Sequence, residues 1–70
     1  MIIKIGQDKL QSALATEARS KRNTLLAESD WTQVADAPVD QAAWATYRQA
    51  LRDITAQDGF PEAIDWPAVP

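Results

Sequence analysis

The 70-residue sequence contains no cysteine and no histidine. Without thiols or imidazoles it can form neither disulfides nor a Cys/His zinc site, and it lacks a cysteine nucleophile and the commonest general base, histidine. Its two glycines, Gly6 and Gly59, are too few and too far apart for a glycine-rich phosphate loop. The sequence therefore predicts no metal site, no cofactor and no enzymatic activity, and nothing in it indicates secretion.

A long apolar run and a strongly basic region are also missing. The apolar start, residues 1–5, is too short for a signal peptide or a membrane span, so we expect no membrane partner. The net charge is −3, with five basic and two acidic side chains in residues 1–22 and two basic and eight acidic ones in residues 23–70. A nucleic-acid-binding protein would carry a concentrated basic face, so nucleic acid is not an expected partner.

The length allows one small domain. A compact chain of this mass would bury roughly 6,800 Å² of surface, which contributes about 100 kcal/mol if a little over half of it is apolar. Ordering the chain costs roughly 105 kcal/mol, so the two contributions nearly cancel. We therefore expect a marginally stable domain that gains stability from a partner or from association into a homo-oligomer.

The strongest helix signal spans residues 42–54, which contain no glycine or proline. Its large apolar residues share one helical face: Trp44, Tyr47, Leu51 and Ile54. Asp40 can cap its start by accepting a hydrogen bond from a free backbone N–H group. We expect the helix to end near residues 57–58, with Gly59 in a left-handed conformation and Pro61 preventing continuation.

A second, longer helix is predicted over residues 8–28. Asp8 and Gln11 resemble a capping box at its start, and an apolar stripe follows the helical spacing. The simplest fold is all-α, an antiparallel two-helix hairpin over residues 8–57, turned by the loop that contains Trp31. Its predicted core comprises Leu14, Leu25, Leu26, Trp44, Tyr47, Leu51 and Ile54.

Two segments flank this hairpin. Residues 1–7 form an extended N-terminal arm with a β-branched start, which is either disordered or loosely packed, or else pairs with another molecule. Residues 58–70 form an extended tail rich in proline and aromatic residues. Phe60 and Trp66 each precede a proline, which disfavours helix at both positions.

Aromatic and arginine side chains dominate protein-binding hot spots. On this basis the candidate partner-binding residues are Trp31, Arg48, Arg52, Phe60 and Trp66. The structural alternatives are that Trp31 packs in the loop, that the tail folds back over the hairpin, and that the two arginines are solvated or pair with nearby carboxylates. The carboxylates at positions 30, 36 and 40 are interpreted as turn and cap residues.

Three separated segments, read together, resemble the phage tail assembly chaperone family. The first is Arg-x-x-Leu-Leu-x-x-Ser-Asp-Trp at residues 22–31, and the second is Ala-Trp-x-x-Tyr-Arg-x-x-Leu-Arg at residues 43–52. The third is Phe-Pro followed by Trp-Pro at residues 60–67. The resemblance covers about residues 19–70, and residues 1–18 carry no part of it.

The resemblance implies a non-enzymatic assembly factor. Such a protein would bind a phage tail or tail-fibre protein in the cytoplasm of the bacterial host and keep it from aggregating before assembly. The alternative is a small structural component that stays in the phage tail or tail fibre.

Overall fold

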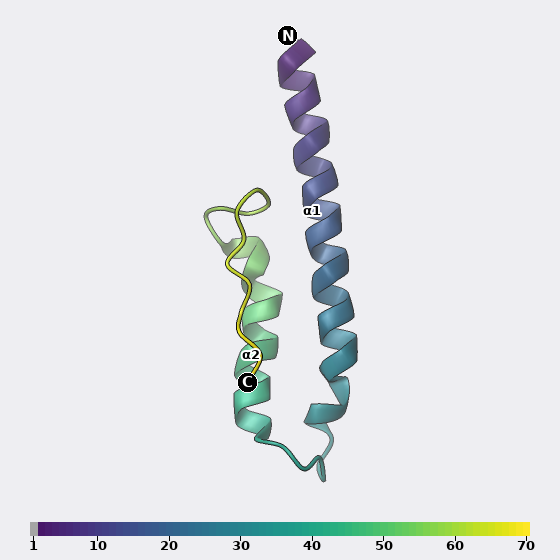
Figure 1. Cartoon of the computed structure of the whole chain (residues 1–70), viewed down its shortest axis with the longest axis vertical. Helices are drawn as coiled ribbons and strands as arrows, with labels where there is room; N and C mark the ends of the chain where they lie inside the picture. The colour runs from purple at the N-terminus through teal and green to yellow at the C-terminus, as the bar shows by residue number, and fades with distance from the viewer. Residues whose placement is uncertain (1) are drawn as a thin grey trace.

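The computed structural model describes the backbone of residues 2–70 and the side chains of residues 9–70. Within that range all regular structure is helical (Figure 1): α1 spans Ile2–Ser29, η1 Asp30–Gln33, α2 Gln41–Arg52 and η2 Asp53–Ala56. The helices α1 and α2 lie side by side and run in opposite directions. The all-helical prediction is therefore confirmed, and the arrangement agrees with the expected hairpin.

The first helix begins earlier than the sequence indicated. Residues 2–7, predicted to be an arm, belong to α1 and continue its helical backbone. A glycine inside a helix costs only about 1 kcal/mol, so Gly6 weakens the segment without ending it. Asp8 consequently lies inside the helix and not at its cap, while its side chain and the whole of Met1 fall outside the described residues.

The second helix begins where its capping residue predicts. The Asp40 carboxylate accepts a hydrogen bond from the backbone N–H of Ala43 at 3.1 Å. The α-helix ends at Arg52, and a 3₁₀ turn carries the chain to Ala56. Regular helical structure therefore ends just before Gln57, where the sequence predicted it would.

Gly59 has a different role from the one predicted. No glycine in the described part of the chain has a positive φ, so the left-handed conformation was wrong. A Cβ at this position would lie 2.2 Å from the carbonyl oxygen of Ala63. Glycine is needed because the chain turns tightly here, with the Ala63 N–H donating to the Gly59 carbonyl at 2.7 Å.

The core is small and lies between α1, α2 and η2. Its fully enclosed apolar side chains are Leu51 and Ile54, joined by the buried Tyr47 and Ala18. The remaining predicted core residues are only half-buried, namely Leu14, Leu25, Leu26 and Trp44. A two-helix hairpin has one seam, and the side chains at its edges stay partly in water.

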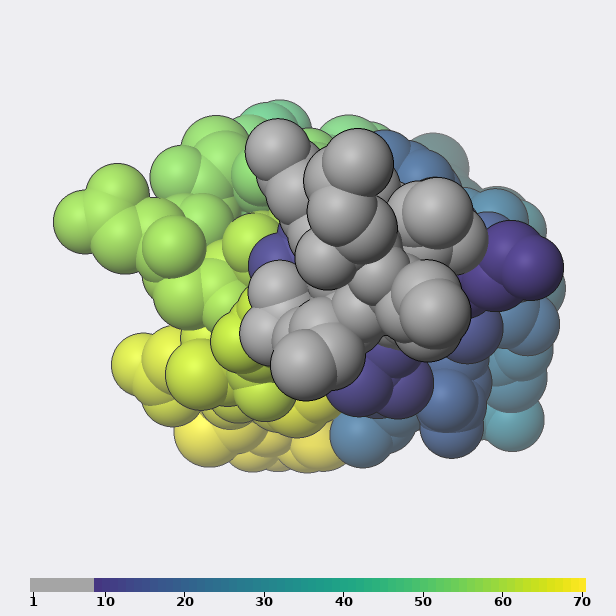
Figure 2. All heavy atoms as spheres, turned by 90° about the horizontal axis from the view of Figure 1, so that it is seen from above, coloured from purple at the N-terminus to yellow at the C-terminus, as the bar shows by residue number. Residues whose placement is uncertain are grey.

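The tail, residues 57–70, returns along the hairpin (Figure 1). Viewed along the long axis, it lies on one flank of the two helices (Figure 2). The Gln57 side chain fixes the turn, because its amide donates to the Asp65 carbonyl at 2.9 Å and accepts from the Asp65 N–H at 2.8 Å. The tail thus starts with an anchored fold-back and has no regular secondary structure beyond it.

The molecule is elongated, with principal extents of 56 × 19 × 13 Å. Its accessible surface is 5070 Å², whereas a compact protein of this mass would expose about 4,300 Å². The difference arises because the first turns of α1 extend beyond the end of α2 (Figure 1). The hairpin therefore buries less surface than a compact domain of the same length.

Candidate partner-binding site at the loop end

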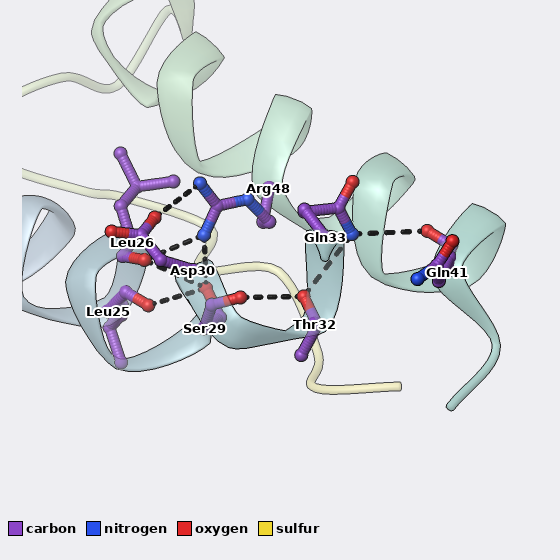
Figure 3. Close-up of polar contacts among 8 residues, drawn as sticks. All are labelled: Leu25, Leu26, Ser29, Asp30, Thr32, Gln33, Gln41 and Arg48. Atoms are coloured by element: carbon purple, nitrogen blue, oxygen red, sulfur yellow. Dashed lines mark hydrogen bonds and ion pairs between the residues drawn. The ribbon is translucent and has the colours of Figure 1, made fainter. Parts of the chain in front are cut away.

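The loop end of the hairpin, residues 25–48, is organised by one arginine. Arg48 projects from α2 to the end of α1, where Nη1 donates to the Leu26 carbonyl and to Ser29 Oγ, each at 2.7 Å (Figure 3). Its Nη2 donates to Asp30 Oδ1, also at 2.7 Å. Carbonyls at a helix end lack intrahelical partners and favour a nearby cation. The last turn of α1 has no basic residue of its own, so Arg48 supplies that charge from α2.

Two small hydroxyl residues complete this junction. Ser29 donates to the Leu25 and Leu26 carbonyls at 2.8 and 3.2 Å while accepting from Arg48. Thr32 is fully buried, and its Oγ1 donates to the Ser29 carbonyl at 2.6 Å. None of the buried side-chain polar atoms in the described part of the chain lacks a hydrogen-bond partner. Neither residue was predicted as part of the site, since Ser and Thr after a helix are equally typical of an exposed turn.

Glutamine side chains close the loop above this junction. Gln33 Nε2 donates to Thr32 Oγ1 at 3.2 Å and to the Gln41 carbonyl at 3.3 Å (Figure 3). Gln41 Nε2 donates in turn to the Val34 carbonyl. These bonds join η1 to the first residue of α2, so the loop is held at both ends.

An aromatic surface lies on this fixed loop. The Trp31 and Trp44 rings are tilted with centroids 6.4 Å apart, and Trp44 meets Tyr47 edge to face at 5.6 Å. Burial decreases outward along this row: Tyr47 is buried, Trp44 is half-buried and Trp31 is 50% exposed. Val34 is 51% exposed in the same loop. Trp31, Val34 and Trp44 are called the loop-end patch below.

The two arginines considered for partner binding do not form a pair. Arg48 is buried, and the contacts described above occupy its guanidinium group. It pairs with the Asp30 carboxylate, which was the structural alternative to partner binding. Arg52 is exposed in the last turn of α2. The two arginines therefore do not form a paired anion site. The guanidinium group of Arg48 binds its own chain and is not available to a partner.

The two tail aromatics are half-buried against α1. Lys21 Nζ lies 4.3 Å from the centroid of the Trp66 ring, and the Arg19 guanidinium carbon lies 5.6 Å from that of Phe60. Both distances suit a cation–π contact. Trp66 also lines a groove of about 300 Å³ between the tail and α1. Tail residues thus contact α1 and leave only part of each ring accessible.

The described residues contain no group of three or more histidine, cysteine, aspartate or glutamate side chains that could hold a metal ion. An open groove of about 800 Å³ runs along α1 and is lined mainly by small side chains, from Ser12 to Leu25. None of the helices in residues 2–70 combines the length and apolarity needed to cross a bilayer. The loop-end patch contains two of the four exposed large apolar side chains among the described residues, Trp31 and Val34.

Comparison with known proteins gives one result. The model of the family described as phage tail assembly chaperone protein matches residues 15–70. This range contains the whole Arg48 junction, the loop-end patch and the tail. Neither a curated protein nor a solved structure matches the chain.

Proposed function

Because the chain belongs to the phage tail assembly chaperone family, we propose that it binds a tail or tail-fibre protein during virion assembly and holds it through the loop-end patch. The partner is a protein synthesised in the same infected bacterium, and the encounter takes place in the host cytoplasm. The role is non-enzymatic. Binding alone accounts for it, because covering apolar surface on a client is enough to prevent aggregation.

The observation that carries this proposal is the exposure of Trp31 on a rigid support. Partly exposed aromatic side chains on a held backbone lose little conformational entropy on binding, and tryptophan is enriched in binding hot spots. The loop that presents Trp31 is fixed by the Arg48, Thr32 and Gln33 hydrogen bonds. The patch can therefore be used without unfolding the hairpin.

The exposed parts of Phe60, Trp66 and Arg52 provide additional contacts in this proposal. Both aromatics lie on the tail, which already contacts α1 through Arg19 and Lys21. Shifting the tail would expose more of both rings to a client. Arg52 stands at the exposed end of α2 and could pair with a client carboxylate.

Co-expression with the tail and tail-fibre genes of the same phage, followed by affinity capture of the full chain, tests the proposal. We expect a tail or tail-fibre protein to be captured and to become more soluble when the chain is present. Capture of no tail protein would overturn it. Mass spectrometry of purified virions then separates the two roles, since a chaperone is absent from the particle and a structural component is retained.

A further inference from the structure

Two residues of the loop-end patch, Trp31 and Val34, lie in a segment that carries acidic side chains and no basic ones. Residues 28–40 carry four carboxylates, Glu28, Asp30, Asp36 and Asp40, and no lysine or arginine. Arg48 enters this region from α2, but it pairs with Asp30 and compensates only one of the four charges. The apolar patch is thus accompanied by three carboxylates that have no ion-pair partner among the described residues.

Asp40 and Trp44 are positioned to act on the same bound segment. They are four residues apart at the start of α2, where the Trp44 N–H donates to the Asp40 carbonyl at 3.1 Å. Asp40 is exposed, as is Asp36 in the loop. If a bound segment packed an apolar side chain against Trp44 and Trp31, the residues that flank that side chain would lie near these carboxylates.

From this combination we infer that the loop-end patch recognises a basic amphipathic segment, in which one or two aliphatic side chains are flanked by lysine or arginine. The inference rests on the proposed function and specifies the chemistry of the client. Complementary charge accelerates the encounter and disfavours partners of the wrong sign. Nucleic acids and anionic membranes carry the same sign as the patch surroundings and would be repelled.

A second copy of the chain is a poorer match for this surface. Its exposed basic residues among those described are spread along α1 and at Arg52 on α2, and two of them, Arg19 and Lys21, already contact the Phe60 and Trp66 rings of their own tail. If Arg19 and Lys21 bound the loop end of another molecule, they would lose their contacts with the Phe60 and Trp66 rings. A separate protein segment does not incur this cost.

The experiment is a calorimetric titration of the full chain with three synthetic twelve-residue peptides. The first carries leucine and lysine at helical spacing, the second replaces every lysine with glutamate, and the third replaces every leucine with serine. We expect measurable binding of the first peptide alone, weakening as salt is raised from 0.05 to 0.5 M. Equal binding of the glutamate peptide, or of the serine peptide, would overturn the inference.

A charge-matched pair of variants assigns the binding to this surface. Asp36→Asn with Asp40→Asn should weaken binding of the lysine peptide about three- to tenfold, as expected for two exposed ion pairs. Asparagine at position 40 keeps the helix cap, because its amide oxygen still accepts from Ala43. Asp58→Asn with Asp65→Asn removes the same charge near the other end of α2 and should change the affinity less than twofold. Equal effects of the two double variants would contradict the assignment.

Two further outcomes separate this inference from the proposed function. A tail protein captured equally well by the wild-type chain and by the Asp36→Asn, Asp40→Asn variant would overturn the inference and leave the function standing. Peptide binding without capture of any tail protein would support the inference and overturn the function. Sedimentation of the chain alone should show a monomer, and a dimer broken by the same double variant would assign the surface to a second copy.

Discussion

Arg48 connects α1 and α2 at the loop end of the hairpin through hydrogen bonds. One guanidinium group reaches a helix-end carbonyl, a buried hydroxyl and a carboxylate, each at 2.7 Å. Lysine could not reproduce this geometry, since its single ammonium group cannot donate from two separate nitrogens. The residue therefore fixes where α1 ends relative to α2.

Replacing Arg48 should destabilise the hairpin. Arg48→Ala leaves Ser29 and the Leu26 carbonyl without their charged donor, and hydrogen bonds to charged groups contribute about 1.5–3 kcal/mol. We expect a loss of about 2–3 kcal/mol in the free energy of unfolding, measured by urea denaturation followed by circular dichroism. Asp30→Asn should cost less than about 1 kcal/mol, because the Asp30 side chain is 68% exposed.

Arg52→Ala is the matched control, as it removes an arginine one turn away that is exposed. It should leave the unfolding midpoint nearly unchanged, since surface substitutions usually stay within about 0.5 kcal/mol. If the Arg48 and Arg52 variants had the same stability, the junction would contribute nothing and the account of the loop end would be wrong.

Gly59 offers a second test at a single position. Gly59→Ala places a methyl group against the Ala63 carbonyl oxygen, 2.2 Å away, so the backbone of the turn must move. We expect a cost of about 1–3 kcal/mol, typical of forced packing, and faster proteolysis within residues 57–66. Ala63→Gly would not relieve the clash, because the obstructing atom belongs to the backbone. Unchanged proteolysis of Gly59→Ala would contradict the tight turn.

At the level of the elements, the tail contacts α1 through two cation–π pairs. Lys21→Ala removes the ammonium group 4.3 Å from Trp66, and such contacts contribute about 0.5–1 kcal/mol at partly exposed sites. We expect the indole N–H signal of Trp66 in a proton–nitrogen spectrum to shift and narrow, while the signals of Trp31 and Trp44 stay in place. Lys9→Ala, an exposed change elsewhere on α1, should leave all three signals alone.

The elements also show what the sequence can predict. The start of α2 followed from Asp40, and the shared helical face led to Tyr47, Leu51 and Ile54, because capping and periodicity are local properties. The start of α1 was misplaced because Gly6 looked like a break, whereas a long helix tolerates one unfavourable residue. The tight turn at Gly59 depends on the approach of Ala63, which no local pattern specifies.

The residues of the candidate site were also predicted only in part. Trp31, Phe60 and Trp66 were predicted from residue type, and the structure leaves each at least partly accessible. Arg48 was assigned to the same set, but the structure places it inside the molecule. Whether an arginine binds a partner or its own chain depends on which groups lie within reach of it. For Arg48 those groups come from residues 18 to 22 positions earlier in the sequence.

At the scale of the whole molecule, the hairpin is long, thin and lightly packed. Only four apolar side chains among the described residues are buried, so little of the stability comes from a central core. A domain of this size is expected to be marginal on its own, and any ligand that binds only the folded state raises its stability by mass action. Binding of a client should therefore stabilise the hairpin as well as hold the client.

In the proposed function, Trp31 on the folded hairpin contributes directly to holding the client. The most direct measurement is calorimetric titration of the captured tail protein with the wild-type chain and with Trp31→Ala. We predict at least a tenfold weaker affinity for the variant, as hot-spot tryptophans cost 2 kcal/mol or more when truncated, with its helical circular dichroism unchanged. Equal affinities of the two folded chains would contradict the account.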